Sequence, residues 1–190
     1  MGMKRGFILL LAVFILAGCS DNVEKVESNE VTIEEAKKEE QKKYDEEQRK
    51  KQEEAERLKQ LEEDLPNILR FVSMHNIKID SAGGAVVKIY FNNSSKKTIK
   101  YISFNVTPYN AVGDVQRDSI SGESTRWLKK TGPIEPMEKG YVEGGGWKGV
   151  WYNNSVTSAT IDGILIEYMD GSKVEIPKEL TGKINTDSSE

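Results

Sequence analysis

The sequence predicts a long charged α-helix followed by an all-β domain, an antiparallel sandwich of the immunoglobulin-like type. An apolar run at the amino terminus ends at the only cysteine of the chain. A stretch of Glu, Lys, Gln, Arg and Ala without Gly or Pro follows, and these residues favour a helix. From about Met74 onward, apolar residues alternate with polar ones between turn signals, which is typical of strands that bury one face.

The first 18 residues have the three parts of a secretory signal. Lys4 and Arg5 give a positive start, residues 7–17 form an unbroken apolar run, and small residues end the segment. An apolar run of about 11 residues suits a signal and is shorter than the roughly 20 residues that a membrane-spanning helix needs. We therefore expect residues 1–18 to be a signal peptide.

The sole cysteine, Cys19, follows Leu16, Ala17 and Gly18. This Leu-Ala-Gly-Cys segment resembles the lipobox of bacterial lipoproteins. The resemblance implies that the Cys19 thiol receives a diacylglyceryl group and that the chain is cut between Gly18 and Cys19. Two acyl chains anchor a protein stably, whereas one chain binds only marginally. The alternative is a structural cysteine after an ordinary signal, and in either case no intramolecular disulfide can form.

A lipid on Cys19 would make the membrane a partner of the protein, on the extracytoplasmic face of the cell membrane. In a cell with one membrane, this is the outer leaflet of the plasma membrane. In a cell with two membranes, Ser20 directly after the cysteine does not resemble a signal for retention at the inner membrane. The Lys-, Glu- and Asn-rich composition favours a cell with one membrane.

A charged helix is predicted over residues 32–65, after a flexible polar leader at residues 19–31. Thr32 and Glu35 have the spacing of a capping box, and Pro66 marks the end of the helix. Acid-before-base pairs four residues apart stabilise such a helix by roughly 0.2–0.5 kcal/mol each. These pairs are Glu34–Lys38, Glu39–Lys43, Glu46–Lys50, Glu47–Lys51 and Glu53–Arg57.

This helix is predicted to be a solitary spacer, about 50 Å long at 1.5 Å per residue. No apolar residue occurs between Tyr44 and Ala55, so a coiled-coil seam does not persist. A short apolar stripe at the end of the segment is expected to pack against the following domain; it comprises Leu58, Leu61, Leu65 and Ile68. The competing interpretation is a disordered charged tract.

Seven strands are predicted within a domain at residues 66–178, and a disordered tail at residues 179–190. The strands are expected at residues 76–80, 85–92, 98–107, 125–131, 141–151, 158–169 and 173–176. Asp170-Gly171, between the last two, is typical of a tight hairpin turn. This number of short strands without helical periodicity favours an immunoglobulin-like antiparallel sandwich.

Three segments of this domain also carry a resemblance. They are residues 100–114 (Lys-Tyr-Ile-Ser-Phe-Asn-Val-Thr-Pro-Tyr-Asn-Ala-Val-Gly-Asp), residues 150–153 (Val-Trp-Tyr-Asn) and residues 166–171 (Ile-Glu-Tyr-Met-Asp-Gly). With Asn92-Asn93-Ser94 and Lys97-Thr98-Ile99, they resemble an uncharacterised domain family of bacterial surface lipoproteins, similar to FxLYD-type sandwich modules. The resemblance covers residues 79–176 and lacks the cysteine pair of antibody domains. It implies a fold and a surface setting, and it brings no catalytic residue.

The sequence predicts no catalytic residue, no metal and no cofactor. His75 is the only histidine, so a zinc site would need carboxylates almost alone, and a structural role is expected for it. The glycine-rich residues 144–149 lack the Gly-Lys-Ser/Thr ending of a phosphate loop. Asp114, Asp162 and Asp170 lack the spacing of an EF-hand.

Aromatic residues give the candidate binding site: Trp127, Trp147, Trp151 and Tyr152. Exposed Trp and Tyr faces can stack on sugars or peptides. Alternation along a strand would place Trp147 and Trp151 on one side and Tyr152 on the other. The alternative for these rings is packing in the core.

Charge narrows the possible partners. The predicted signal holds two of the 27 basic residues and none of the 31 acidic ones, so the rest of the chain has a net charge of −6. An acidic protein is a poor candidate for nucleic-acid binding. The first hypothesis is a non-enzymatic surface module that contacts an envelope protein. The second is binding of cell-wall glycan or peptidoglycan through the aromatic residues. The third is a hydrolase, whose paired carboxylates only a structure could identify.

Overall fold

A computed structural model of the protein describes residues 23–75, 77–142 and 145–184. The predicted signal peptide and Cys19 lie outside these residues. The chain divides into two units, residues 1–52 and residues 53–190. The described part of the first unit is helical, and the second unit begins within the same helix and contains every strand.

Helix α1 spans Val23–Asp64. It begins before Thr32, so the prediction of a flexible leader is wrong for residues 23–31, which contain no Gly or Pro to stop a helix. Two of the predicted ion pairs, Glu46–Lys50 and Glu47–Lys51, form with N–O distances of 2.7 Å each. The helix ends at Asp64 and is followed by a 3₁₀ turn, Leu65–Asn67, which contains Pro66.

The last turns of α1 belong to the second unit and pack on its core. Leu58 and Leu61 lie against the core, and Leu65 in the following turn is buried, which confirms the predicted apolar stripe. Glu62 forms an ion pair with Lys183 at 2.6 Å. We call residues 65–184 the β domain.

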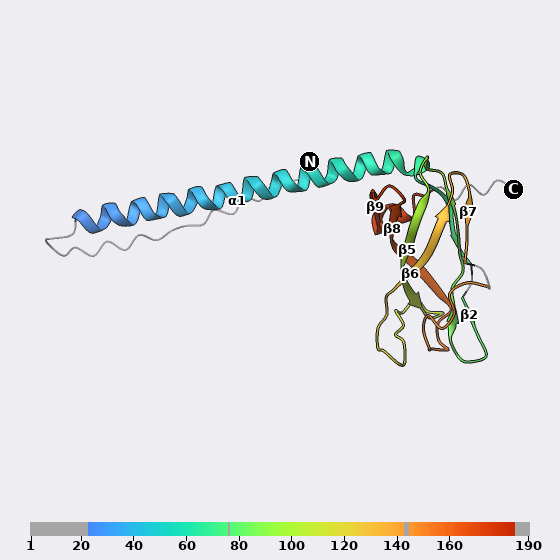
Figure 1. Cartoon of the computed structure of the whole chain (residues 1–190). Coiled ribbons are helices and arrows are strands. Elements are labelled where there is room, and N and C mark those ends of the chain that lie inside the picture. Colours follow the sequence, from blue (N-terminus) through green and yellow to red (C-terminus); the bar gives the residue numbers. More distant parts are fainter. Residues whose placement is uncertain (1–22, 76, 143–144, 185–190) are drawn as a thin grey trace, which may run out of the picture. The chain divides into compact units, whose positions relative to one another are not determined.

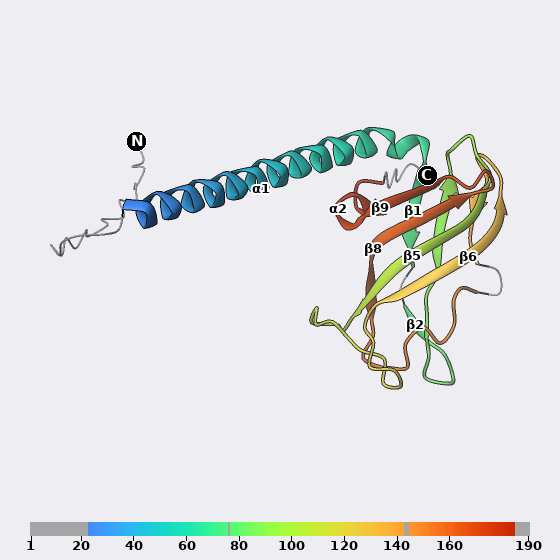
Figure 2. The same cartoon turned by 60° about the vertical axis from the view of Figure 1, so that its left-hand side comes forward.

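The β domain contains antiparallel sheets only (Figures 1 and 2). A three-stranded sheet has the order β1-β4-β7, with β1 at Leu69–Met74, β4 at Ile89–Asn93 and β7 at Lys139–Gly140. A four-stranded sheet has the order β6-β5-β8-β9, with β5 at Ile99–Tyr109, β6 at Arg126–Ile134, β8 at Ser158–Tyr168 and β9 at Lys173–Pro177. A small ribbon pairs β2 (Lys78–Ile79) with β3 (Ala85–Val86).

One apolar core lies between the two larger sheets. In Figure 2 the four-stranded sheet faces the viewer and β1 lies behind it. Phe91 of β4 packs on Phe104 of β5 with 5.5 Å between ring centroids. Gly140 of β7 allows this packing, because a Cβ at that position would lie 2.1 Å from the Cζ of Phe91. A helix followed by antiparallel sheets that share a core is consistent with the predicted β-sandwich.

Several segments differ from the predicted strands. The strand predicted at residues 85–92 is divided into β3 and β4, and the short β7 was not predicted. Residues 69–74 form β1, which was not predicted because its pairing with β4 shifts register between Arg70 and Ser73 and so interrupts the alternation. The strand predicted at residues 141–151 is wrong. There Gly145 and Gly146 have φ angles of 98° and 104°, and a Cβ on Gly146 would lie 2.3 Å from the Val87 carbonyl oxygen. The described part of this segment is therefore a connection that runs close to neighbouring backbone.

The predicted disordered tail is wrong for residues 179–184. A short helix, α2 (Lys178–Thr181), follows β9 directly. Leu180 and Ile184 are both buried in the core, so this segment packs on the rest of the β domain. Its mostly polar composition led to the prediction of disorder. Residues 185–190 lie outside the described part of the chain.

Candidate functional site

Two of the four predicted aromatic residues belong to the core. Trp151 is fully buried, and its Nε1 donates to the Ser124 carbonyl oxygen at 2.7 Å. Trp147 is half-buried and packs edge-on against Phe104, with ring centroids 6.2 Å apart. Its Nε1 donates to the Lys129 carbonyl oxygen at 3.1 Å. Both indole N–H groups thus donate to backbone carbonyl oxygens of β6 or of the segment just before it.

The other two aromatic residues lie elsewhere. Trp127 is 55% exposed and pairs with Asn105, on the face of the four-stranded sheet that points away from the core. Tyr152 is 38% exposed and follows the buried Trp151. The structure therefore does not bring the four rings together into one exposed surface, and Trp127 is the one with the most accessible ring.

The outer face around Trp127 is electrically balanced. Glu167 of β8 pairs with Lys100 at 3.1 Å and with Lys173 at 3.3 Å. The hydrogen bond from Lys100 holds the pKa of the Glu167 carboxyl below its usual range. The Nζ of Lys129 lies 3.5 Å from the centroid of the Tyr101 ring, in a cation–π contact. The cations of this face are therefore engaged within the protein.

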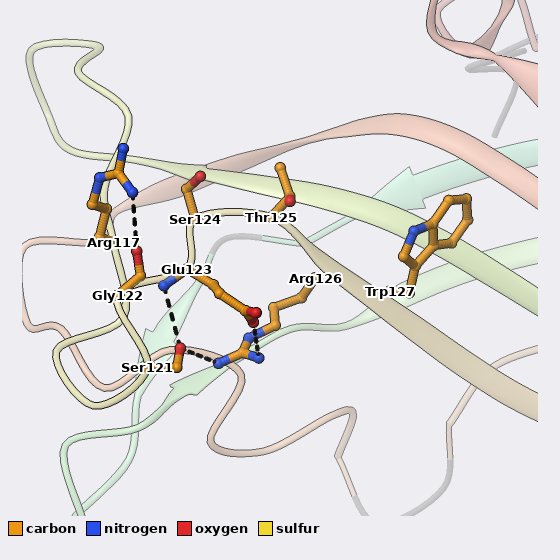
Figure 3. A pocket seen from close by; sticks show the side chains of 8 residues that line it. All are labelled: Arg117, Ser121, Gly122, Glu123, Ser124, Thr125, Arg126 and Trp127. Carbon is orange, nitrogen blue, oxygen red and sulfur yellow. Dashed lines mark hydrogen bonds and ion pairs between the residues drawn. The ribbon is translucent and has the colours of Figure 1, made fainter.

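A hollow of about 630 Å³ lies beside Trp127 at the start of β6 (Figure 3). Its polar side chains bond to one another. Arg126 donates to Glu123 at 2.6 Å and to Ser121 Oγ at 2.7 Å, and Arg117 donates to the Gly122 carbonyl oxygen at 3.0 Å. Trp127 lies apart from this cluster in Figure 3. The bonds hold the loop between β5 and β6 in place and leave the hollow few uncommitted groups for a ligand.

Asp118 is a buried hydrogen-bond acceptor for this loop. The carboxylate is buried and accepts from the Tyr152 N–H at 2.7 Å, from the Ser121 hydroxyl at 2.8 Å and from Arg126 at 3.0 Å. The Tyr152 N–H is the main cause that lowers the pKa of Asp118 to about 2, and the Ser121 bonds add to it against the opposing effect of burial. These contacts tie the segment after Trp151 to the loop before β6.

Asp118→Asn is expected to lower the free energy of unfolding by about 2 kcal/mol, because an amide cannot accept all the bonds that the carboxylate accepts. The folded pKa lies below the ordinary value of about 3.9, so the carboxylate contributes stability above that pH and loses it as pH falls toward 2. Urea denaturation at pH 7 and at pH 3 measures both effects. The difference between the two proteins should shrink at pH 3, and an unchanged difference would contradict the assignment.

A group of exposed rings lies on the other side of the β domain. His75 and Tyr90 have ring centroids 4.7 Å apart, and Tyr90 and Tyr141 are stacked at 6.1 Å with 27° between their planes. Tyr90 is 40% exposed, Tyr141 is 49% exposed, and His75 is exposed as well. We call these three residues the ring trio. Sequence reasoning missed it, because its members come from separate segments and His75 was expected to be structural.

Comparison with known proteins assigns no role to these residues. No protein-family model matches the sequence, no curated protein matches it, and no solved structure matches it. The case for a site therefore rests on the contacts and exposure of the side chains themselves.

Among the described residues, no group of three or more His, Cys, Asp and Glu side chains is placed to hold a metal ion. None of the helices in this part of the chain combines the length and the hydropathy of a membrane-spanning segment. The candidate site is the ring trio, beside the three-stranded sheet, and Trp127 lies away from it on the outer face of the four-stranded sheet.

Proposed function

We propose that this chain is a lipid-anchored bacterial surface protein that displays a non-enzymatic, immunoglobulin-like binding module on a helical spacer. The observation that carries the binding role is the ring trio, because Tyr90 and Tyr141 stack on each other in solvent instead of packing in the core. Exposed apolar patches mark interaction sites, and aromatic residues are enriched among the residues that contribute most to binding.

The anchor and the spacer have separate support. Leu16–Cys19 has the lipobox pattern, and it lies outside the described residues. Helix α1 has 42 residues, which corresponds to about 60 Å at 1.5 Å per residue. The Glu–Lys pairs along it stabilise a helix without a partner. A tether with these properties would suit a module that works at some distance from the bilayer.

Glycan binding is the alternative function. For this function, the ring trio is a better candidate site than the four aromatic residues that the sequence suggested. Trp151 is buried in the core and Trp147 packs against it, whereas Tyr90 is 40% exposed and Tyr141 is 49% exposed. A sugar ring presents C–H groups that pack well on such faces. The same surface could contact a protein, so the two functions differ in the partner and not in the site.

Cys19→Ser should abolish lipid attachment, because a hydroxyl is a far weaker nucleophile than the thiol that forms the thioether. Cells that express the full chain and are fed labelled palmitate should label the protein only when Cys19 is present. The variant should also stay at precursor size. Ser20→Ala, one residue away, is the matched control and should be labelled and cut normally. A Cys19→Ser chain that is still labelled and cut would overturn the anchor.

The binding role has its own test. Chemical cross-linking on intact cells that display the full chain should attach it to one defined envelope component, either a protein or a glycopolymer. Tyr90→Ala should reduce this product, and Trp127→Ala tests whether the opposite face contributes instead. A chain that cross-links to nothing in the envelope would contradict a binding module.

A further inference from the structure

The outer face of the three-stranded sheet has an unbalanced positive charge. Its strands β1, β4 and β7 contain no acidic residue. Arg70, Asn92 and Lys139 form one row across them, because Arg70 pairs with Asn92 and Asn92 pairs with Lys139. Whereas the chain as a whole carries a net charge of −4, this face is basic.

Alternation along the strands shows that these side chains point away from the core. Leu69 and Phe91 are buried, so their neighbours Arg70 and Asn92 face outward. Lys139 precedes the buried Gly140 and faces outward with them. The Nε of Arg70 donates to the Pro66 carbonyl oxygen at 3.0 Å, which fixes the guanidinium at the edge of this face.

The ring trio continues the same face. Ser73 pairs with Tyr90, and the next outward position on β1's side is His75, whose N–H donates to the Lys88 carbonyl oxygen at 3.0 Å. Lys88 follows the buried Val87, so its side chain is also on the outer side. Stacked rings and cations therefore alternate across a single open surface.

Two glutamates flank the strands and rings of this face in the sequence. Glu138 comes directly before β7, and its Oε2 accepts from the Glu135 N–H at 2.7 Å. Glu143 follows Tyr141 in the sequence and lies outside the described residues. On the four-stranded sheet, by contrast, Glu167 pairs with two lysines. The positive charge on the face of the three-stranded sheet would therefore complement an anionic partner, whereas those two lysines on the four-stranded sheet are already paired.

We propose that this basic ring face, formed by Arg70, His75, Lys88, Tyr90, Lys139 and Tyr141, binds an anionic glycan. The ligand is a polymer of sugar rings with spaced carboxylate or phosphate groups, so the proposal rests on the binding role proposed above. Tyr90 and Tyr141 stack on the sugar faces, while Arg70 and Lys139 pair with the anionic groups. An open sheet face suits a chain that lies across it, whereas a small molecule needs an enclosing pocket.

Affinity electrophoresis of the full chain in neutral detergent tests the proposal. Native gels contain polygalacturonate, a glycosylated polyol phosphate, dextran or polyglutamate. The first two polymers should retard the protein at low salt, and the retardation should weaken as salt rises. A preference for one of them tells whether the anionic group is a carboxylate or a phosphate. Dextran lacks charge and polyglutamate lacks sugar rings, so neither should retard the protein comparably.

Four variants locate the site. Tyr90→Ala and Lys139→Gln should each weaken binding to the retarding polymer by about tenfold, the usual effect of removing one central contact. On the other sheet, Trp127→Ala removes an exposed aromatic side chain and Lys173→Gln removes an exposed lysine charge, and both variants should bind normally. Circular dichroism melts of all four confirm that the fold is retained, since each changed side chain is exposed.

Three results would overturn the inference: equal retardation by dextran, equal retardation by polyglutamate, or loss of binding in the control variants and not in the test variants. If no polymer retards the chain but cross-linking on cells still captures an envelope protein, the glycan ligand is wrong and the binding module stands. If both experiments fail, the proposed function fails with it.

Discussion

Trp151→Ala is expected to lower the free energy of unfolding of the β domain by about 3–5 kcal/mol, the usual cost of removing a buried tryptophan. Trp151 is fully buried, and its Nε1 donates to the Ser124 carbonyl oxygen at 2.7 Å. The substitution leaves a cavity in the core and an unpaired carbonyl oxygen, so two costs add. A loss of this size is a large fraction of the total stability of a small domain.

Urea denaturation followed by far-ultraviolet circular dichroism measures this loss without relying on tryptophan fluorescence. Trp151→Phe keeps most of the packing and loses only the hydrogen bond and part of the volume, so its cost should be intermediate. Trp127→Ala removes the same side chain from an exposed position and should change stability by less than about 0.5 kcal/mol. Equal losses for the two alanine variants would show that Trp151 is not a core residue.

Elements whose pattern lies within one segment could be predicted from the sequence. The strand predicted at residues 98–107 is β5 (Ile99–Tyr109), and the one predicted at residues 158–169 is β8 (Ser158–Tyr168). Each has a run in which buried and more exposed positions alternate. The Asp170-Gly171 turn is also local, because Gly171 adopts a φ of 84° that glycine tolerates. Such features need no information about the rest of the fold.

Other elements depend on partners that are distant in sequence. The order of β1 beside β4 follows from tertiary packing, and the register shift after Arg70 removes the local pattern. The described part of the segment predicted at residues 141–151 forms an isolated bridge between Trp147 and Val87, and Val150 and Trp151 exchange backbone hydrogen bonds with Ala85. Its glycines weaken a regular strand, and Gly146 instead allows a close approach to neighbouring backbone.

The candidate site shows the same limit. The types of residue that suit a binding surface could be recognised, but which tryptophan is exposed could not. Trp127 and Trp151 differ because one belongs to a regular strand with its odd positions outward, whereas the other lies in an irregular connection. The ring trio brings together His75, Tyr90 and Tyr141 only after the three-stranded sheet has formed.

Asn93→Asp is expected to lower the free energy of unfolding by at least about 3 kcal/mol, because Asn93 is a fully buried hydrogen-bonding centre. Its Nδ2 donates to the carbonyl oxygens of Lys97 at 2.9 Å, Ile134 at 3.0 Å and Glu135 at 3.1 Å. Its Oδ1 accepts from the Ser95 hydroxyl at 2.6 Å. Aspartate has the same shape, yet it would set a carboxylate oxygen against three carbonyl oxygens.

The pH dependence of that variant should identify the cause. Burial among acceptors would raise the pKa of an aspartate at this position above the ordinary value of about 3.9. The unfolded chain loses the proton near that value while the folded protein keeps it, so the deficit should grow as pH rises above about 4 and shrink below it. Asn154→Asp adds the same charge at an exposed position and should show neither effect. Asn93→Asp removes the amide donors at every pH and adds a charge only where the aspartate is ionised, so a deficit that is equal at pH 3 and pH 7 would mean that the lost donors, and not the buried charge, account for its instability.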